Sequence, residues 1–101
     1  MAVIFMDVDH FKSINDGHGH AAGDAVLKEF AARIRRAVRS TDTAARLAGD
    51  EFVVILEGLQ GDAEASQVAA KLVDAIRPPM ALPGGGEILV TTSVGMACWQ
   101  G

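Results

Sequence analysis

Runs of apolar residues separated by polar, glycine-rich breaks predict a series of strands and helices along the chain. The first run, over 2–6, is apolar throughout and predicts a central strand buried on both faces. A short helix is predicted over 10–15, with Asp9 as its N-cap and Gly17 as its C-terminal stop. A longer amphipathic helix is predicted from about residue 22 to residue 38. Its buried stripe recurs at every fourth position, at Val26, Phe30, Ile34 and Val38. Its charged residues are expected to form a solvated face: Lys28, Glu29, Arg33, Arg35 and Arg36.

The second half of the chain predicts a hairpin, a helix and two further strands. Strands over 43–47 and 52–56 flank a tight turn. A helix begins near Asp62, which is able to cap it, and ends before a Pro-Pro pair. A short strand is expected over 80–82, and a half-buried antiparallel strand over 88–97. The order β-α-α-β-β-α-β-β indicates an α+β fold, an α/β sandwich with a palm-like, mostly antiparallel central sheet flanked by helices.

Composition narrows the class of protein. A chain of 101 residues, half of them hydrophobic, has the size of one domain with one core. The formal net charge of −4 argues against DNA, RNA or a membrane surface as a partner, so a phosphate ligand would be held by metal ions and backbone amides. The single cysteine, Cys98, excludes an intrachain disulfide, and no Cys/His group has zinc spacing. No signal peptide or membrane-spanning run is visible, so a cytoplasmic protein is expected.

Carboxylates stand at the ends of two predicted strands. Asp7 follows the first strand, where α/β folds commonly place ligands, and Asp50 and Glu51 occupy the hairpin turn. Crowded acids are costly unless a cation lies between them, and carboxylates that hold two hard cations are the basis of two-metal phosphoryl transfer. A solvated hairpin tip is the alternative interpretation. Turn, capping or surface roles are open for the polar residues between the first two helices: Asn15, His20 and Asp24.

Three motifs, in order and at the right spacing, make the chain resemble the GGDEF domain of bacterial diguanylate cyclases. They are Phe5–Asp16 (FMDVDHFKSIND), Gly19–Asp24 (GHAAGD) and Arg46–Phe52 (RLAGDEF). The resemblance as a whole covers essentially the whole chain. The resemblance implies that two GTP molecules condense to cyclic di-GMP with loss of two pyrophosphates. It also implies a homodimer in which each protomer binds one GTP, and a sensor domain fused upstream in the parent protein.

The resemblance implies a role for each acid at the strand ends. Asp7 and Asp50 would be ligands of Mg²⁺ (or Mn²⁺), with the backbone carbonyl of Val8 as a third ligand. Asp50 would also help to deprotonate the 3′-hydroxyl that attacks the α-phosphate. Glu51 would assist at the metal and the ribose.

The family's substrate residues also have counterparts in this chain. Asn15 and Asp24 would read guanine, because a carboxylate accepts from the N1–H and the exocyclic amino group together. Gly49 would belong to the same substrate site, and His20 would lie near the substrate or hold the loop. The phosphates would rest on backbone amides at a helix N-terminus, those of His10, Phe11 and Lys12.

Arg39 and Asp42 match the family's inhibitory RxxD site for cyclic di-GMP, at the family spacing before Ala48. Arg39 would take a guanine edge or a phosphate, and Asp42 the N1/N2 edge of guanine. Without the family, an exposed arginine at a helix end followed by a turn aspartate is the simpler interpretation.

Three departures from the family pattern affect the expected activity. Ala48 replaces the first glycine of the motif, and its methyl group is disfavoured if the backbone needs a positive φ. The family's N-terminal helix, and its C-terminal helix with the last strand, have no counterpart. Residues 1–101 are therefore interpreted as the central portion of the domain, truncated at both ends, with weak or no activity alone. The alternative is a GGDEF-derived module that binds cyclic di-GMP or GTP as a sensor.

Overall fold

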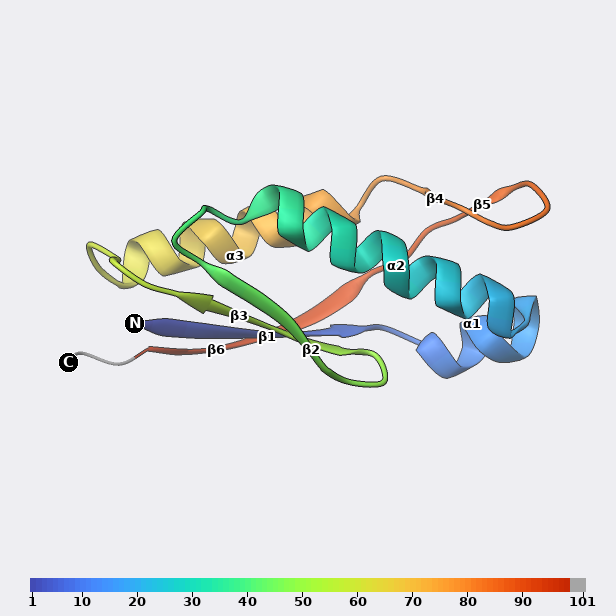
Figure 1. Ribbon diagram of the computed structural model, residues 1–101, viewed down its shortest axis with the longest axis horizontal. Helices are drawn as coiled ribbons and strands as arrows, with labels where there is room; N and C mark the ends of the chain where they lie inside the picture. The colour runs from blue at the N-terminus through green and yellow to red at the C-terminus, as the bar shows by residue number, and fades with distance from the viewer. Residues whose placement is uncertain (99–101) are drawn as a thin grey trace.

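The computed structural model describes residues 1–98, which form a four-stranded sheet, a two-stranded ribbon and three helices (Figure 1). The strands of the sheet lie in the order β2-β3-β1-β6, and each neighbouring pair is antiparallel. The predicted α+β fold with an antiparallel central sheet is confirmed. In chain order the elements are β1 (Ala2–Val8), α1 (Phe11–His18), α2 (His20–Ala37), β2 (Thr43–Ala48), β3 (Glu51–Leu56), α3 (Asp62–Ile76), β4 (Met80–Ala81), β5 (Glu87–Ile88) and β6 (Thr92–Cys98).

The core lies between the sheet and the two long helices, α2 and α3, which cover the same face of the sheet (Figure 1). Phe30 of α2 is fully buried, and its ring centroid lies 4.9 Å from that of Phe52 in β3. Val26 and Ile34 are buried beside Phe30, whereas Val38 is only partly buried at the edge of the core. The stripe predicted from the sequence therefore is the face by which α2 packs on the sheet.

Two predicted strands differ from the structure. β1 is central in the sheet but buried on one face only: Met6 and Val8 are buried, while Phe5 is 45% exposed. Within the described residues, no helix covers the face of the sheet opposite α2 and α3. The apolar run over 2–6 therefore did not indicate burial on both faces. The strand predicted over 88–97 is divided, because β5 pairs with β4 and β6 pairs with β1. The alternation of apolar and polar residues along a segment does not reveal that its two parts pair with different strands.

The ends of α1 also differ from the prediction. Asp9 does not cap the helix: the N-cap is His10, a left-handed residue with φ 58°, and no side chain caps the helix. The helix continues through Gly17 and ends at Gly19, whose φ of 91° favours glycine. α1 and α2 are therefore separated by a single residue, which brings their facing side chains close together.

The ends of α3 are stabilised from outside the helix. Asp62 is its first residue but makes no capping bond, and the N-cap is Gly61. At the other end, Arg33 of α2 donates hydrogen bonds of 2.6–3.4 Å to four carbonyl groups, those of Ala75, Ile76, Pro78 and Pro79. The last carbonyls of a helix lack partners within the helix, and Arg33 satisfies them. Its side chain is only 11% exposed, so the prediction of a solvated Arg33 was wrong.

Candidate functional site

The acids of β1 and β3 meet at one end of the sheet. Asp7 stands directly opposite Glu51 in the β1–β3 ladder. The backbone N–H of Val8 donates to the carbonyl oxygen of Asp50 over 3.1 Å. Two segments that are far apart in the sequence are thus in direct contact, and the structure brings together the acids predicted to act as one site.

The turn between β2 and β3 is shaped by Arg46 and Gly49. Gly49 has a φ of 51°, in the left-handed region that favours glycine, and its carbonyl accepts a 2.8 Å hydrogen bond from Nε of Arg46. A β-bulge lies between Arg46 and Ala48. Ala48 itself has no positive φ, because His10 is the one non-glycine residue in 1–98 that does. The backbone therefore does not require a glycine at position 48.

Three carboxylates at this end have no partner. Within residues 1–98, the side chains of Asp7, Asp50 and Glu51 make no hydrogen bond or ion pair. Together with the nearby main-chain carbonyls they offer hard oxygen atoms, the ligands that Mg²⁺ prefers. The described part of the chain has no group of three or more His, Cys, Asp or Glu side chains arranged to hold an ion. The residues fit Mg²⁺ bound in its usual way, by one or two carboxylates with water and substrate phosphates completing the shell.

Asp9 ties the β1–α1 turn to β6 instead of capping α1. Its carboxylate accepts hydrogen bonds from the hydroxyl of Ser93 at 2.5 Å and that of Thr91 at 2.7 Å, and its N–H donates to the carbonyl of Thr91 at 3.0 Å. The bonds from Ser93 and then Thr91 outweigh the opposing effect of burial and hold the pKa of Asp9 below its usual value. Asp9 therefore anchors the turn that leads into α1 to the start of β6, through both its side chain and its backbone N–H.

The first turn of α1 presents free backbone amides next to the acids. Its first intrahelical bond runs from the N–H of Ile14 to the carbonyl of His10, so the amides before Ile14 have no partner within the helix. Such amides favour an anion. The side chains of Lys12 and His20 are exposed and make no hydrogen bond or ion pair within residues 1–98.

Asn15 packs closely against α2 because Gly23 lets α1 and α2 approach. A Cβ atom added to Gly23 would lie 1.8 Å from Oδ1 of Asn15 and 3.3 Å from Cζ of Phe11. Only a glycine leaves room for the Asn15 amide at this place. Asp24 follows Gly23 on α2 and is exposed, so the second predicted guanine-reading residue lies one position beyond this helix–helix contact.

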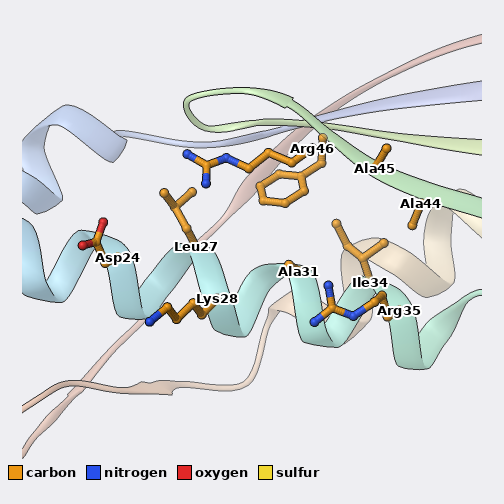
Figure 2. Close-up of a pocket in the computed structure, with 10 residues that line it drawn as sticks. Asp24, Leu27, Lys28, Ala31, Ile34, Arg35, Ala44, Ala45 and Arg46 are labelled. Carbon is orange, nitrogen blue, oxygen red and sulfur yellow. The ribbon is translucent and has the colours of Figure 1, made fainter.

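A cavity of about 370 Å³ opens between α2 and β2, beginning at Asp24 (Figure 2). Arg46 reaches from β2 across the cavity toward Leu27 on α2, as Figure 2 shows. The cavity has an apolar interior and basic residues along its rim. It is lined by Asp24, Leu27, Lys28, Ala31, Ile34, Arg35, Ala44, Ala45, Arg46 and Phe52.

Arg39 and Asp42 form a closed ion pair in the turn between α2 and β2. Both carboxylate oxygens of Asp42 accept from the Arg39 side chain at 2.9 and 3.1 Å, and Oδ2 also accepts from the Arg39 N–H at 2.9 Å. The Asp42 side chain is fully buried. Burial alone would raise the pKa of Asp42, but the bonds and the charge of Arg39 lower it overall, and the same bonds raise the pKa of Arg39.

Arg39 has two further contacts, one to the first turn of α3 and one to the connection between β3 and α3. Nη1 donates to Oε1 of Glu64 at 2.7 Å, and Nη2 donates to the carbonyl of Glu57 at 3.2 Å. This cluster lies at the end of β2 and β3 opposite to their turn (Figure 1). At about 3.3 Å per strand residue, Asp42 lies roughly 20 Å from Ala48.

Sequence reasoning missed four residues that shape these sites: Gly23, Glu64, Thr91 and Ser93. Gly23 belongs to a quoted motif, but nothing in the sequence indicates which side chain approaches it. Thr91 and Ser93 are polar residues within a predicted strand, and Glu64 lies three residues after a helix start, the spacing of a capping residue. These signals are too common to identify a site without the tertiary contacts.

Comparisons with known proteins agree on one family. A family model described as "Diguanylate cyclase, GGDEF domain" matches residues 1–101. The chain is 42% identical over 99 residues to the diguanylate cyclase TpbB of Pseudomonas aeruginosa, covering 98% of this chain and 23% of TpbB. It is 46% identical over 100 residues to MucR of the same organism, a bifunctional diguanylate cyclase and cyclic di-GMP phosphodiesterase, covering 99% of this chain and 14% of MucR.

Solved structures agree as well. The GGDEF domain of TpbB superposes with a TM-score of 0.92 at 43% identity, covering 94% of this chain and 55% of that one. The GGDEF domain of DgcB from Caulobacter crescentus, solved in complex with cyclic di-GMP, superposes with a TM-score of 0.85 at 26% identity, covering 94% of this chain and 57% of that one. The chain thus spans about a quarter or less of these relatives and little more than half of the solved domains. Among residues 1–98, the helices are too short or too polar to cross a membrane.

Proposed function

This chain belongs to the GGDEF family, and we propose that it forms the catalytic domain of a diguanylate cyclase that condenses two GTP molecules to cyclic di-GMP and two pyrophosphates. One observation carries the proposal. Asp7 of β1, Asp50 of the β2–β3 turn and Glu51 of β3 stand at one end of the sheet with no side-chain partner in residues 1–98, near the contact where Asn15 approaches Gly23, the residue before Asp24. Three carboxylates at one end of a sheet are best balanced by a bound cation. The nearby Asn15 and Asp24 have the hydrogen-bonding groups that suit a guanine base.

The acids would act on the reacting phosphate. Asp7, Asp50 and the carbonyl of Val8 would hold Mg²⁺ (or Mn²⁺), which when bound neutralises charge on the reacting and leaving phosphates. In each step the 3′-oxygen of one GTP forms a bond to the α-phosphorus of the other. The bond from that phosphorus to the β-phosphate oxygen breaks, pyrophosphate leaves, and Asp50 accepts the proton of the 3′-hydroxyl. Glu51 would support the ribose and the metal.

The remaining groups would bind and orient GTP. Asp24 would accept from N1–H and the exocyclic amino group of guanine, a pair of donors that adenine lacks, while the Asn15 amide supports the base. Gly49 and His20 would border the nucleotide. The free amides at the start of α1 would hold the β- and γ-phosphates, which suits an acidic protein: those of His10, Phe11 and Lys12.

The active form would be a homodimer, because one protomer has one set of guanine-reading residues and the product contains two guanines.

We also propose that residues 1–101 are the central portion of a larger domain. The exposed Phe5 on the uncovered face of the sheet supports this, as does the share of the solved GGDEF domains that the chain spans. By itself the chain is then expected to turn over GTP weakly or not at all. An upstream sensor domain and a cytoplasmic location belong to the same proposal.

Product feedback would act at Arg39 and Asp42. Support comes from the RxxD spacing and from a structural relative that was solved with cyclic di-GMP. Arg39 would bind a phosphate or a guanine edge of the product.

A second function is favoured by one observation. The GGDEF domain of DgcB was solved in complex with cyclic di-GMP, so a domain of this fold is able to bind the product. The same domain therefore also suits a sensor module that binds cyclic di-GMP or GTP without turnover. Incubating the full-length parent protein with GTP and Mg²⁺ tests the choice. Cyclic di-GMP among the products supports the enzyme; tight cyclic di-GMP binding in calorimetry without any product supports the sensor.

A further inference from the structure

The RxxD pair is closed in this structure, and its closure involves a residue outside the motif. Asp42 is fully buried, and both of its oxygens are occupied by Arg39. Arg39 is 36% exposed, and the nitrogen not bound to Asp42, Nη1, donates to Glu64 over 2.7 Å. The fork of donors that would receive a phosphate or a guanine edge is thus already taken by carboxylates of the chain itself.

Glu64 is held in place from its other side. Its Oε2 accepts a 2.9 Å hydrogen bond from the N–H of Gln60, in the loop that enters α3. The contact resembles the reach-back of a capping residue, which satisfies a free amide near the helix start. The position of Glu64 is therefore set by its own helix, and Glu64 presents a fixed negative charge to Arg39.

An anion that binds Arg39 must meet this charge. A product phosphate would compete with Glu64 for Nη1 or bind beside it, and either arrangement is opposed by the negative charge of Glu64. We infer that Glu64 is an internal competitor of the RxxD site and lowers its affinity for a phosphate-bearing ligand. The inference rests on the proposed product site and adds a residue that sets its strength.

The size of the effect follows from the exposure of the pair. Partly exposed ion pairs contribute modestly, so removal of the Glu64 charge is expected to tighten ligand binding about two- to fivefold. Gln is the suitable substitute, because its carbonyl oxygen still accepts from Gln60 or Arg39 while the charge is lost. The α3 terminus then keeps its hydrogen bond.

The test is calorimetric titration of cyclic di-GMP into the full-length wild-type protein and its Glu64→Gln variant. Asp62→Asn is the matched control, because Asp62 lies in the same helical turn, carries the same charge and makes no hydrogen bond or ion pair within residues 1–98. Circular dichroism and thermal unfolding establish that each variant is folded. We expect tighter binding for Glu64→Gln, no comparable change for Asp62→Asn, and loss of the gain in the double variant Arg39→Ala/Glu64→Gln.

The outcomes separate the two levels of the proposal. Equal or weaker binding by Glu64→Gln overturns the competition, while the product site stands if wild type binds and Arg39→Ala does not. A gain that survives in the double variant, or that Asp62→Asn reproduces, also overturns the competition. Unchanged binding by Arg39→Ala alone, or no binding by either wild type or Glu64→Gln, removes the product site and the competition together.

Discussion

Gly23 controls how closely Asn15 approaches α2 and so shapes the proposed substrate site. We expect Gly23→Ala to weaken GTP binding about tenfold or more, because a methyl group would lie at 1.8 Å from Oδ1 of Asn15 and displace the amide. Fluorescent GTP titration measures the loss. Gly17→Ala is the matched control in α1, since nothing lies within 4 Å of its Cβ position. Equal GTP affinity in the two variants would contradict this role.

Asp50 is the acid with both a metal and a proton role in the proposed reaction. Its side chain makes no hydrogen bond or ion pair within residues 1–98, and its backbone carbonyl, which accepts from Val8, survives substitution. Asp50→Ala in the full-length protein is therefore expected to reduce turnover at least about 100-fold with little change in melting temperature. Product formation is followed by chromatography. Glu87→Ala, an exposed acid on β5, is the control and should keep wild-type turnover. Retained activity in Asp50→Ala would remove Asp50 from both roles.

At the scale of elements, Arg33 joins α2 to the C-terminal end of α3. Its four hydrogen bonds satisfy carbonyls that have no other partner in the helix, so Arg33→Ala should lower the free energy of unfolding by about 2 kcal/mol. Arg33→Lys keeps the charge but loses the fork, and should lie between wild type and Arg33→Ala. Urea unfolding measures the series. Arg35 makes no hydrogen bonds to α3, so Arg35→Ala should change the free energy of unfolding by less than about 0.5 kcal/mol. An equal loss in the two alanine variants would show that the positive charge of α2, and not the hydrogen bonds of Arg33, is responsible.

The Arg39–Asp42 pair joins three elements and makes stability depend on pH. The pKa of Asp42 is lower in the folded than in the unfolded chain, so its contribution is complete above about pH 4 and is lost as the pH falls through the folded value. Asp42→Asn should cost about 1.5–3 kcal/mol at pH 7 and progressively less toward pH 2. Unfolding curves for wild type and variant, recorded across that range, should converge. Parallel curves would show that the charge of Asp42 is not what stabilises the turn.

At the scale of the whole molecule, the proposed reaction needs two protomers. If each protomer holds one GTP, the specific activity of the full-length protein should rise with protein concentration and level off once dimers predominate. GTP binding, a property of one protomer, should stay constant over the same range and serves as the internal control. Specific activity that remains unchanged over a hundredfold dilution, with monomers verified by light scattering, would contradict the dimer requirement.

Local pattern in the sequence was sufficient for much of the fold. The stripe of Val26, Phe30 and Ile34 defines the buried face of α2 because helical periodicity places those residues on one side. The apolar run of β3 likewise marks a core strand. The acids at Asp7 and Asp50 were identifiable because charged residues directly next to buried strands are unusual, and because the motifs around them are specific.

Tertiary structure decided what depends on contacts between distant segments. Asp9 bonds to the hydroxyls of Thr91 and Ser93, at the entry to β6 and more than eighty residues away, so its appearance as an N-cap was misleading. Arg33 resembled a surface residue until the end of α3 and the segment that follows it placed carbonyl groups around it. The same holds for Gly23 beneath Asn15 and for Glu64 against Arg39. Periodicity reports which face of an element is buried; only the packed chain determines which polar groups meet, because hydrogen bonds and ion pairs depend on distances that the sequence does not contain.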